Sequence, residues 1–360
     1  MIPSYARILR TVQPLKRSAS KIDGLIELET GGCIEFWSLE NEDAGRSRSY
    51  DLAIIDEASL VAKGLRETWD QAIRPTLLDR GGRAIMAGTP KGVDDENYFY
   101  QACTDKTLGW HEIHAPTSAN PTLDPASVAA LATEYPPLVY QQEFLADFVD
   151  WNGTAFFGEL SMLVDGLPVD YPTKTDQVFA VVDTALKDGV EHDGTAVIYF
   201  CKNKYAGHPL IILDYDLIQI KGDLLDQWIP SVEARCEQLA VQTGARQGNV
   251  GTWIEDKASG IVLIQSSQRK GKKVYPIPAE ITALGKEGRA LAVSSHVFQG
   301  KVKFSRYAYD KVVNFKGITK NHLLSQVCGF RLGVKTPHGM DVLDCFTGGV
   351  AIGLGDADGY

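Results

Sequence analysis

The sequence predicts a two-domain α/β protein. Short apolar runs that end in acidic or polar turns alternate with helical stretches, which is typical of parallel sheets whose ligands lie at the carboxyl ends of the strands. The 360 residues suffice for two cores of ordinary size. Between Trp151 and Asp176 the periodicity gives way to Gly, Pro and Asp. We therefore expect a first domain over 1–150, a linker over 151–176 and a second domain over 177–360.

In the first domain, strands and helices follow one another in a regular order. The expected elements are a hairpin over 26–36, a buried strand over 52–55, a helix over 65–78, a strand within 83–92 and helices within 120–148. Gly31 and Gly32 provide the turn of the hairpin. Asp124 is a helix cap, with Pro125 at the first helical position.

The second domain begins with three β-rich segments in succession, which predicts a meander. The expected elements are strands over 177–185, 194–200 and 209–220, a helix over 225–239, a strand that ends at Glu255 and Asp256, and helical stretches around 323 and 342. The basic run from 268 to 273, QRKGKK, is expected in a solvated loop, where it could contact phosphate.

Composition excludes several classes of protein. The 44% hydrophobic and 23% charged residues are typical of a soluble globular chain. No apolar run approaches the length of a membrane span, and the N-terminus lacks the pattern of a secretion signal. The six cysteines include no CxxC pair, which argues against a disulfide framework or a thiolate zinc site and favours a reducing, cytosolic compartment. The net charge of −10 does not decide the partner, because a local basic groove can coexist with it.

An adjacent acidic pair, Asp56 and Glu57, follows the apolar run 52–55 in DLAIIDEASLV. In nucleotide hydrolysis, such a pair holds Mg²⁺ through its Asp and polarises the attacking water through its Glu. The same pair is also explained by an acidic helix N-terminus, which the helix dipole favours. The partner of this site would be a phosphate-binding loop of the form GxxxxGK[ST], and the sequence contains none.

Carboxylates recur beside apolar runs in the second domain: Asp183 in AVVDTA, Glu255 in TWIED, and Asp341 with Asp344 in HGMDVLDCF. A strand with an Asp, a later strand ending in acid and a C-terminal helix bearing Asp is the arrangement of an RNase H-like nuclease. Two divalent ions that clamp the attacking water and the leaving oxygen of a phosphodiester require several hard carboxylates. Asp193 would be an auxiliary ligand or an ordinary turn residue.

The chain resembles the large terminase subunit of tailed phages and prophages over nearly its whole length. The matching segments are IELETGGCIEFWSLE, RSYDLAIIDEAS, AIMAGTPKG, NPTLDPASVAALATEYPPLVYQQEFLADFVD, AVVDTALKDGVEHDGTAV, WIEDKASGIVLIQ and HGMDVLDCF. That family joins an ASCE-type (P-loop-type) ATPase domain, which drives DNA into a capsid, to an RNase H-like endonuclease domain, which cuts concatemeric DNA. The resemblance implies the same two activities here.

The resemblance also implies roles for individual residues. Asp56 and Glu57 match the Walker B acids, and Thr89 matches the coupling motif that senses hydrolysis. The nuclease triad matches Asp183, Glu255 and Asp341. Met340 stands where the family has the first Asp of its last motif, so either Asp341 or Asp344 completes the metal site.

Cofactors, partners and location follow from the same resemblance. It implies two Mg²⁺ or Mn²⁺ ions in the nuclease site, ATP, double-stranded viral DNA, a portal protein and a small terminase subunit, in the host cytoplasm and transiently at the procapsid portal. The segment IPSYARILRTVQ resembles the one that follows the phosphate loop in the family, so we expect the chain to begin after that loop and to hydrolyse ATP negligibly. It would then be a truncated or split product, a fragment whose missing part another chain supplies, or the product of a misplaced start.

Two other functions fit parts of the sequence. A catalytically degenerate prophage remnant would only bind DNA or packaging proteins. A helicase or recombination ATPase would explain the DEA segment and the strand ending in GTP, but not the nuclease-like carboxylates that follow.

Overall fold

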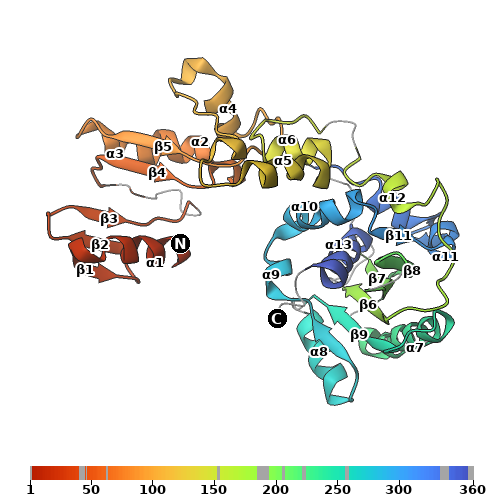
Figure 1. Ribbon diagram of the computed structural model, residues 1–360. Coiled ribbons are helices and arrows are strands. Elements are labelled where there is room, and N and C mark those ends of the chain that lie inside the picture. Colours follow the sequence, from red (N-terminus) through yellow and green to blue (C-terminus); the bar gives the residue numbers. More distant parts are fainter. Residues whose placement is uncertain are drawn as a thin grey trace. The chain divides into compact units, whose positions relative to one another are not determined.

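The computed structural model describes residues 2–39, 45, 47–61, 64–151, 155–184, 194–204, 207–220, 224–255, 259–332 and 340–355. The chain forms two compact units (Figure 1). The first unit comprises Met1–Ala119 and Gln141–Asp150, and the second comprises Asn120–Tyr140 and Trp151–Tyr360.

The first unit contains an antiparallel sheet and a pair of parallel strands. The sheet has the order β1 (Lys16–Ser20), β2 (Leu25–Leu28), β3 (Cys33–Glu35), and follows α1 (Ile2–Thr11). β4 (Leu52–Ile55) and β5 (Arg83–Met86) pair in parallel. They are joined by α2 (Leu65–Thr68), the π-helical turn η3 (Trp69–Ile73) and α3 (Arg74–Leu78), and are followed by α4 (Tyr98–Thr104). The predicted hairpin, both strands and the helix between them are confirmed.

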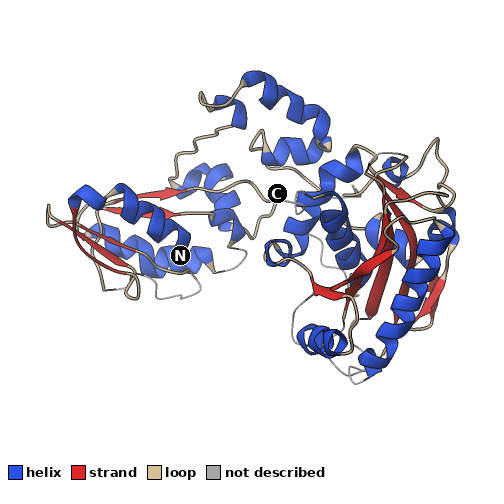
Figure 2. Cartoon of the chain, turned by 60° about the horizontal axis from the view of Figure 1, so that its bottom comes forward, coloured by secondary structure: helices blue, strands red, loops and turns tan. Residues whose placement is uncertain are grey.

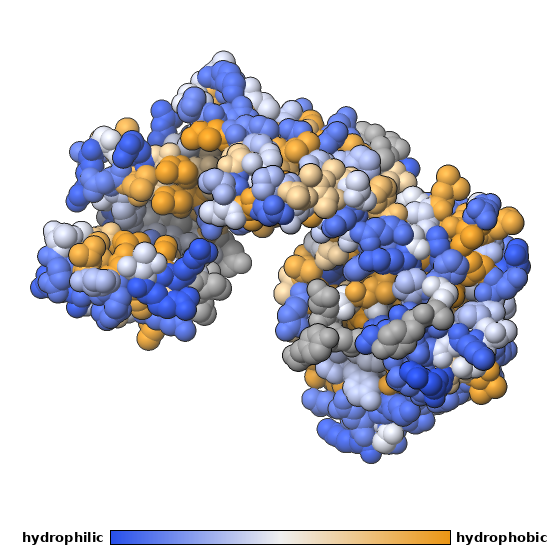
Figure 3. All heavy atoms as spheres, in the orientation of Figure 1, coloured by the Kyte–Doolittle hydropathy of each residue, from blue (hydrophilic) through white to orange (hydrophobic). Residues whose placement is uncertain are grey.

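The prediction that 52–55 is a buried strand is wrong in one respect. Only Ile55 is buried, whereas Leu52 is 46% and Ile54 64% exposed. Ile85 on β5 is exposed as well, and apolar side chains gather over these two strands in Figure 3. The reason is that the pair forms a two-stranded sheet of its own within the described residues, so one face of β4 has no covering layer there.

The second unit is built on a six-stranded sheet with the order β10-β9-β6-β7-β8-β11. Its strands are β6 (Gln177–Asp183), β7 (Thr195–Lys202), β8 (Leu210–Ile218), β9 (Asn249–Ile254), β10 (Val274–Pro276) and β11 (Val302–Phe304). β6, β7 and β8 form the predicted antiparallel meander, and β9 lies parallel to β6. This order and these directions are those of the RNase H-like fold, which confirms the predicted fold class.

Helices cover both faces of this sheet (Figure 2). The helices that follow the first three strands are α7 (Leu225–Gln242), α8 (Ser259–Arg269), α9 (Ala279–Thr282), α10 (Gly285–Phe298), α11 (Arg306–Asp310), α12 (His322–Val327) and α13 (Asp341–Leu354); β12 (Val313–Phe315) and β13 (Ile318–Lys320) form a small hairpin. Because side chains alternate along a strand, Val178, Ala180 and Val182 of β6 face α7. The other residues of β6, among them Val181, face α13.

α13 lies unusually close to the sheet because it carries glycines where it touches strands. A Cβ atom at Gly349 would overlap the ring of Phe200 on β7, and one at Gly353 would lie 2.7 Å from Cδ1 of Leu210 on β8. At Gly349 the absence of a Cβ avoids an overlap with an aromatic ring, whereas at Gly353 the end of the leucine side chain could move aside. The close packing fixes the distance between the first turn of α13 and the end of β6.

The structure also places the segments around the predicted linker. Within the second unit lie α5 (Pro125–Glu134) and η6 (Glu159–Met162), whereas α6 (Pro137–Glu143) continues into the first. The buried Lys303 side chain donates from Nζ to the carbonyl oxygens of Ser161 and Leu163, each at 2.8 Å. Apolar side chains of residues 155–176 are buried in the second unit, among them Phe156, Phe157, Met162 and Leu163.

No helix in the described part of the chain has both the length and the apolar character needed to cross a membrane.

Candidate active site

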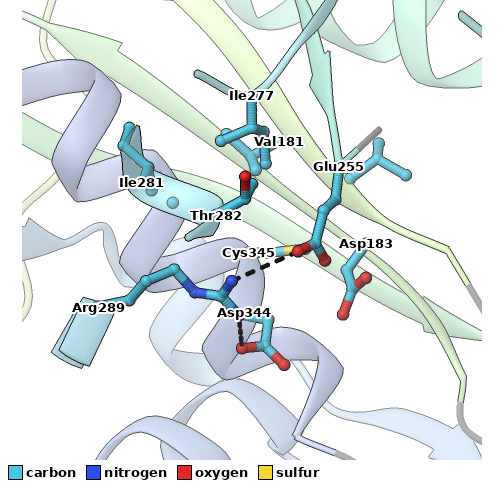
Figure 4. A pocket seen from close by; sticks show the side chains of 11 residues that line it. Val181, Asp183, Glu255, Ile277, Ile281, Thr282, Arg289, Asp344 and Cys345 are labelled. Atoms are coloured by element: carbon cyan, nitrogen blue, oxygen red, sulfur yellow. Dashed lines mark hydrogen bonds and ion pairs between the residues drawn. The ribbon is translucent and has the colours of Figure 1, made fainter. Parts of the chain in front are cut away.

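Two neighbouring strands of the second unit bring Asp183 and Glu255 together. Asp183 is the last residue of β6, and Glu255 directly follows β9. The strands are parallel, and Val182 pairs with Ile254, so the next residue of each strand lies at the same edge. Figure 4 shows both carboxylates pointing into one pocket. The acid-ending strands predicted from the sequence thus converge at the carboxyl edge of the sheet.

The first turn of α13 supplies a third carboxylate to this pocket. Asp344 lines it, together with Cys345 and Gly348 of the same helix face. Asp341 lies one turn earlier and is buried, and its Oδ2 accepts a hydrogen bond from the backbone N–H of Gly194 at 2.9 Å. Asp341 therefore ties the beginning of β7 to α13, whereas Asp344 is the residue that faces the pocket.

Two cations on α10 approach Asp344. Arg289 donates from Nη2 to Asp344 Oδ1 (2.5 Å) and from Nη1 to Glu255 Oε1 (3.4 Å), so it bridges two of the carboxylates (Figure 4). Lys286, one turn earlier, pairs with Asp344 Oδ2 at 3.0 Å. Neither residue was among those predicted. Both lie in the unremarkable segment GKEGR, and only the fold brings that segment to the acidic edge of the sheet.

The pocket concentrates negative charge. Burial raises the pKa of Asp183 well above its ordinary value, and the carboxylates of Asp344, Asp341 and Glu255 raise it further. Burial alone would lower the pKa of Arg289, but Asp344 and Glu255 outweigh that effect and raise it, so the guanidinium stays charged. The pocket therefore contains carboxylates that repel one another and a buried cation that partly offsets them.

Cys345 lines the pocket but is not suited to act as a nucleophile. Burial, followed by the neighbouring carboxylates, raises the pKa of its thiol well above the ordinary range. Its Sγ donates a weak hydrogen bond to the carbonyl oxygen of Ala196 at 3.4 Å. The thiol is protonated at neutral pH, and the reactive form of a cysteine is the thiolate.

The chemistry of the donor set fits a divalent cation, because Asp183, Glu255 and Asp344 offer hard oxygen ligands in one small pocket. Among the residues that the structure describes, no three His, Cys, Asp or Glu side chains are already arranged to hold a metal ion. Arg289 bridges Glu255 and Asp344 instead. The three carboxylates can therefore bind a cation if Arg289 breaks its contact with Glu255 or with Asp344.

Other predicted residues have different positions. Asp193 and Asp256 lie outside the described residues. The basic run 268–273 lies at the end of α8 and in the exposed turn that follows, as expected of a solvated loop; there Lys270 pairs with Asp226, Lys272 pairs with Glu233, and Lys273 donates to the carbonyl oxygen of Asn249.

In the first unit, the parallel pairing of β4 and β5 brings the two predicted segments to one edge. Ala58 N donates to Ala87 O at 2.9 Å, which joins the loop of Asp56 and Glu57 to the loop of Thr89. Both acids are exposed, and Glu57 has a left-handed backbone (φ 50°). The structure thus places these residues at neighbouring strand ends.

The sequence matches to known proteins are all to large terminase subunits of bacteriophages. No protein-family model matches the chain. The large terminase subunit of Escherichia phage T5 is 28% identical over 172 residues, which cover 46% of this chain and 39% of the T5 protein. That of Thermus phage G20c is 28% identical over 144 residues, covering 35% of this chain and 28% of the G20c protein. The chain thus spans less than half the length of these relatives.

A solved structure shows the same fold. The large terminase of a thermophilic bacteriophage matches with a TM-score of 0.60 over 98% of this chain and 82% of that one, at 14% identity. This match includes both units, and it agrees with the family indicated by the sequence matches. The chain is therefore related to the large terminase subunits of bacteriophages.

Proposed function

We propose that the chain is a large terminase subunit whose second unit is a metal-dependent endonuclease that cuts concatemeric viral DNA. One observation carries this proposal: Asp183, Glu255 and Asp344 come from three separate elements and line one pocket at the carboxyl edge of the sheet. Burying several carboxylates together is unfavourable without cations, so the arrangement is best explained by cation binding.

The residues of the chain have distinct roles in this proposal. Asp183 and Glu255, on adjacent strands, would hold cations at a fixed spacing, and Asp344 would hold them from the helix. Asp341 would keep α13 in register with β7 through its contact with Gly194. Bound Mg²⁺ or Mn²⁺ would activate water and stabilise the charge that develops on the phosphodiester. Asp193 stays a proposed auxiliary ligand.

The first unit would contribute to an ATPase site. Asp56 would bind Mg²⁺, Glu57 would orient the attacking water, and Thr89 on the adjoining loop would sense hydrolysis. The large terminase of the same thermophilic bacteriophage has been solved in complex with ADP, which supports nucleotide binding for this fold. The sequence has no GxxxxGK[ST] loop, so we propose that these 360 residues hold an incomplete ATPase site.

The proposed partners are those of the packaging reaction: double-stranded viral DNA, a portal protein and a small terminase subunit. The proposed location is the host cytoplasm, and transiently the procapsid portal. The alternative is a remnant that binds DNA or packaging proteins without cleavage. The ion pairs of Arg289 favour that alternative if they are permanent, because they occupy two of the carboxylates.

Plasmid cleavage in the presence of Mn²⁺ and without ATP tests the nuclease. The native protein is expected to cut, and Asp183→Asn and Glu255→Gln are expected to abolish cutting while leaving the fold intact, because each keeps its shape but loses a charged ligand. The matched control is Asp170→Asn, which removes an exposed carboxylate of the same unit and should cut normally. An intact plasmid with the native protein would favour the non-catalytic alternative, and cleavage by Asp183→Asn would refute the assignment of the nuclease to this carboxylate pocket.

A further inference from the structure

The buried arginine of the carboxylate pocket is only partly satisfied. Its side chain is 9% exposed, and its Nε is buried without a hydrogen-bond partner. The contact with Asp344 is short (2.5 Å), whereas that with Glu255 is long (3.4 Å). A permanent structural pair of arginine and carboxylate commonly has two short parallel hydrogen bonds. Arg289 instead divides its two hydrogen bonds between two carboxylates and leaves its Nε without a partner.

The charge on Arg289 has a clear electrostatic reason. A guanidinium is costly to bury unless carboxylates compensate it, and the carboxylates are equally costly to gather without a cation. Lys286 contributes a second positive charge, but its side chain is 41% exposed, so water screens its interaction with Asp344. Arg289 is therefore the principal internal counter-charge among the described residues that line the pocket.

A divalent cation needs the same oxygens. Its ligands would be carboxylate oxygens of Glu255 and Asp344, which are the atoms that Arg289 now contacts. The two positive groups also repel one another, so they compete for the pocket. The longer contact, to Glu255, is the one that separates more easily.

We propose that Arg289 is a displaceable counter-cation of this pocket: it holds Glu255 and Asp344 together when no divalent ion is bound, and it releases Glu255 when one binds. This inference rests on the metal site of the proposed function. It makes Arg289 a residue that sets the affinity for metal, and it couples metal binding to the position of α10. The opposite role, in which Arg289 orients the carboxylates as ligands, predicts the opposite effect of its removal.

Calorimetric titration with Mn²⁺ separates these roles. Arg289→Met keeps the length of the side chain without the charge, and we expect it to bind Mn²⁺ about tenfold more tightly than the native protein, the equivalent of one lost competing contact. Arg289→Lys keeps a charge that cannot span both carboxylates, and a smaller gain is expected. Arg306→Met, the control, removes a half-exposed arginine that pairs with Asp170 and does not line the pocket, and it should change affinity by less than about threefold.

Thermal unfolding by circular dichroism gives a second readout. Without metal, Arg289→Met should unfold at a lower temperature than the native protein, because Glu255 and Asp344 lose the buried cation that bridges them. Mn²⁺ should raise its unfolding temperature by more than it raises that of the native protein. If Arg289→Met does not fold, Arg289→Lys still decides the question by titration, since it keeps the charge.

Unchanged or weaker Mn²⁺ binding in both Arg289 variants would overturn the inference. Asp183→Asn distinguishes that failure from failure of the proposed function. If the native protein binds Mn²⁺ and Asp183→Asn does not, the metal site stands and the Arg289 variants alone judge this inference. If neither the native protein nor the Arg289 variants bind Mn²⁺, both the inference and the metal-dependent function are refuted.

Discussion

The glycines of α13 allow a sharp test of how the helix positions the acidic pocket. Gly349 and Gly348 are adjacent in the same buried helix, but their surroundings differ. A Cβ at Gly349 would overlap the ring of Phe200, which is fully buried and stacks on Phe179 (centroids 5.2 Å apart, planes at 16°). A Cβ at Gly348 would meet Ile277 and Val181 at 3.5 Å, an ordinary contact. An alanine side chain therefore fits at position 348 without rearrangement, whereas at position 349 it would force the surrounding core to shift.

The expected magnitudes follow from two opposing effects. Replacing glycine by alanine inside a helix gains about 1 kcal/mol of helix propensity at either position. Overpacking a tight core costs roughly 1–3 kcal/mol, and the stacked Phe200 ring cannot swing aside to reduce that cost. We therefore expect Gly348→Ala to be neutral or stabilising by up to about 1 kcal/mol, and Gly349→Ala to be less stable than Gly348→Ala by roughly 1–3 kcal/mol.

Urea unfolding of the two variants, followed by circular dichroism, measures the difference between them. The pair is matched in chemistry, helix and neighbouring sequence, so effects on the unfolded state cancel. Plasmid cleavage adds a functional readout: shifting α13 away from β7 moves Asp344, so Gly349→Ala should also cut more slowly. Equal or greater stability of Gly349→Ala relative to Gly348→Ala would refute the claim that glycine is needed for the close approach of α13.

Three further predictions concern single carboxylates. Burial and the nearby Asp344 raise the pKa of Asp183 in the folded state above its value in the unfolded state. The folded state therefore binds this proton more tightly, and the free energy of unfolding falls as the pH rises from the unfolded pKa (about 3.9) through the folded pKa. Asp183→Asn removes this slope and should be more stable than the native protein at pH 7 in metal-free buffer; parallel pH profiles of unfolding would contradict this. Asp344→Asn should abolish Mn²⁺-dependent cleavage and also lower the unfolding temperature, because Arg289 loses a charged partner, whereas Asp341→Asn should lower the unfolding temperature through the weakened hydrogen bond to Gly194 but still cut; cleavage by Asp344→Asn and none by Asp341→Asn would make Asp341 the ligand. The 360-residue chain should hydrolyse ATP at background rate and Glu57→Gln should leave that rate unchanged; a rate that the substitution abolishes would reveal an unrecognised phosphate-binding loop.

Local pattern was sufficient for most of the fold. The continuous apolar, β-rich runs that became β6, β7 and β8 predicted the meander, because short apolar runs bounded by turn residues are typical of strands buried on both faces. Asp124 was predicted as a cap, and its Oδ2 does accept from Ser127 N at 2.9 Å, an interaction confined to four consecutive residues. Such features depend on near neighbours in sequence, so they can be recognised without the tertiary structure.

The sequence also allowed the convergence of Asp183 and Glu255 to be predicted. Both follow apolar runs, and the carboxyl ends of parallel strands meet at one edge of a sheet. The exposure of Ile54 could not be predicted from the sequence, because an apolar run indicates a strand but does not show whether a second layer of structure covers that strand. The pairing of Lys270 and Lys272 with acids of α7 likewise depends on contacts between distant segments.

By itself, the sequence determined that two α/β units are present, that acids end two strands and begin a late helix, and that the chain resembles large terminase subunits. Only the tertiary structure decided which acid of α13 faces the pocket and which cation accompanies it. Asp341 and Asp344 are three residues apart and equally acidic in sequence, but helix rotation and the glycine contacts of α13 direct Asp344 to the pocket and leave Asp341 to Gly194. Arg289 carries no signal in sequence, because its charge acquires a role only where α10 meets Glu255 and Asp344, 34 and 55 residues away along the chain.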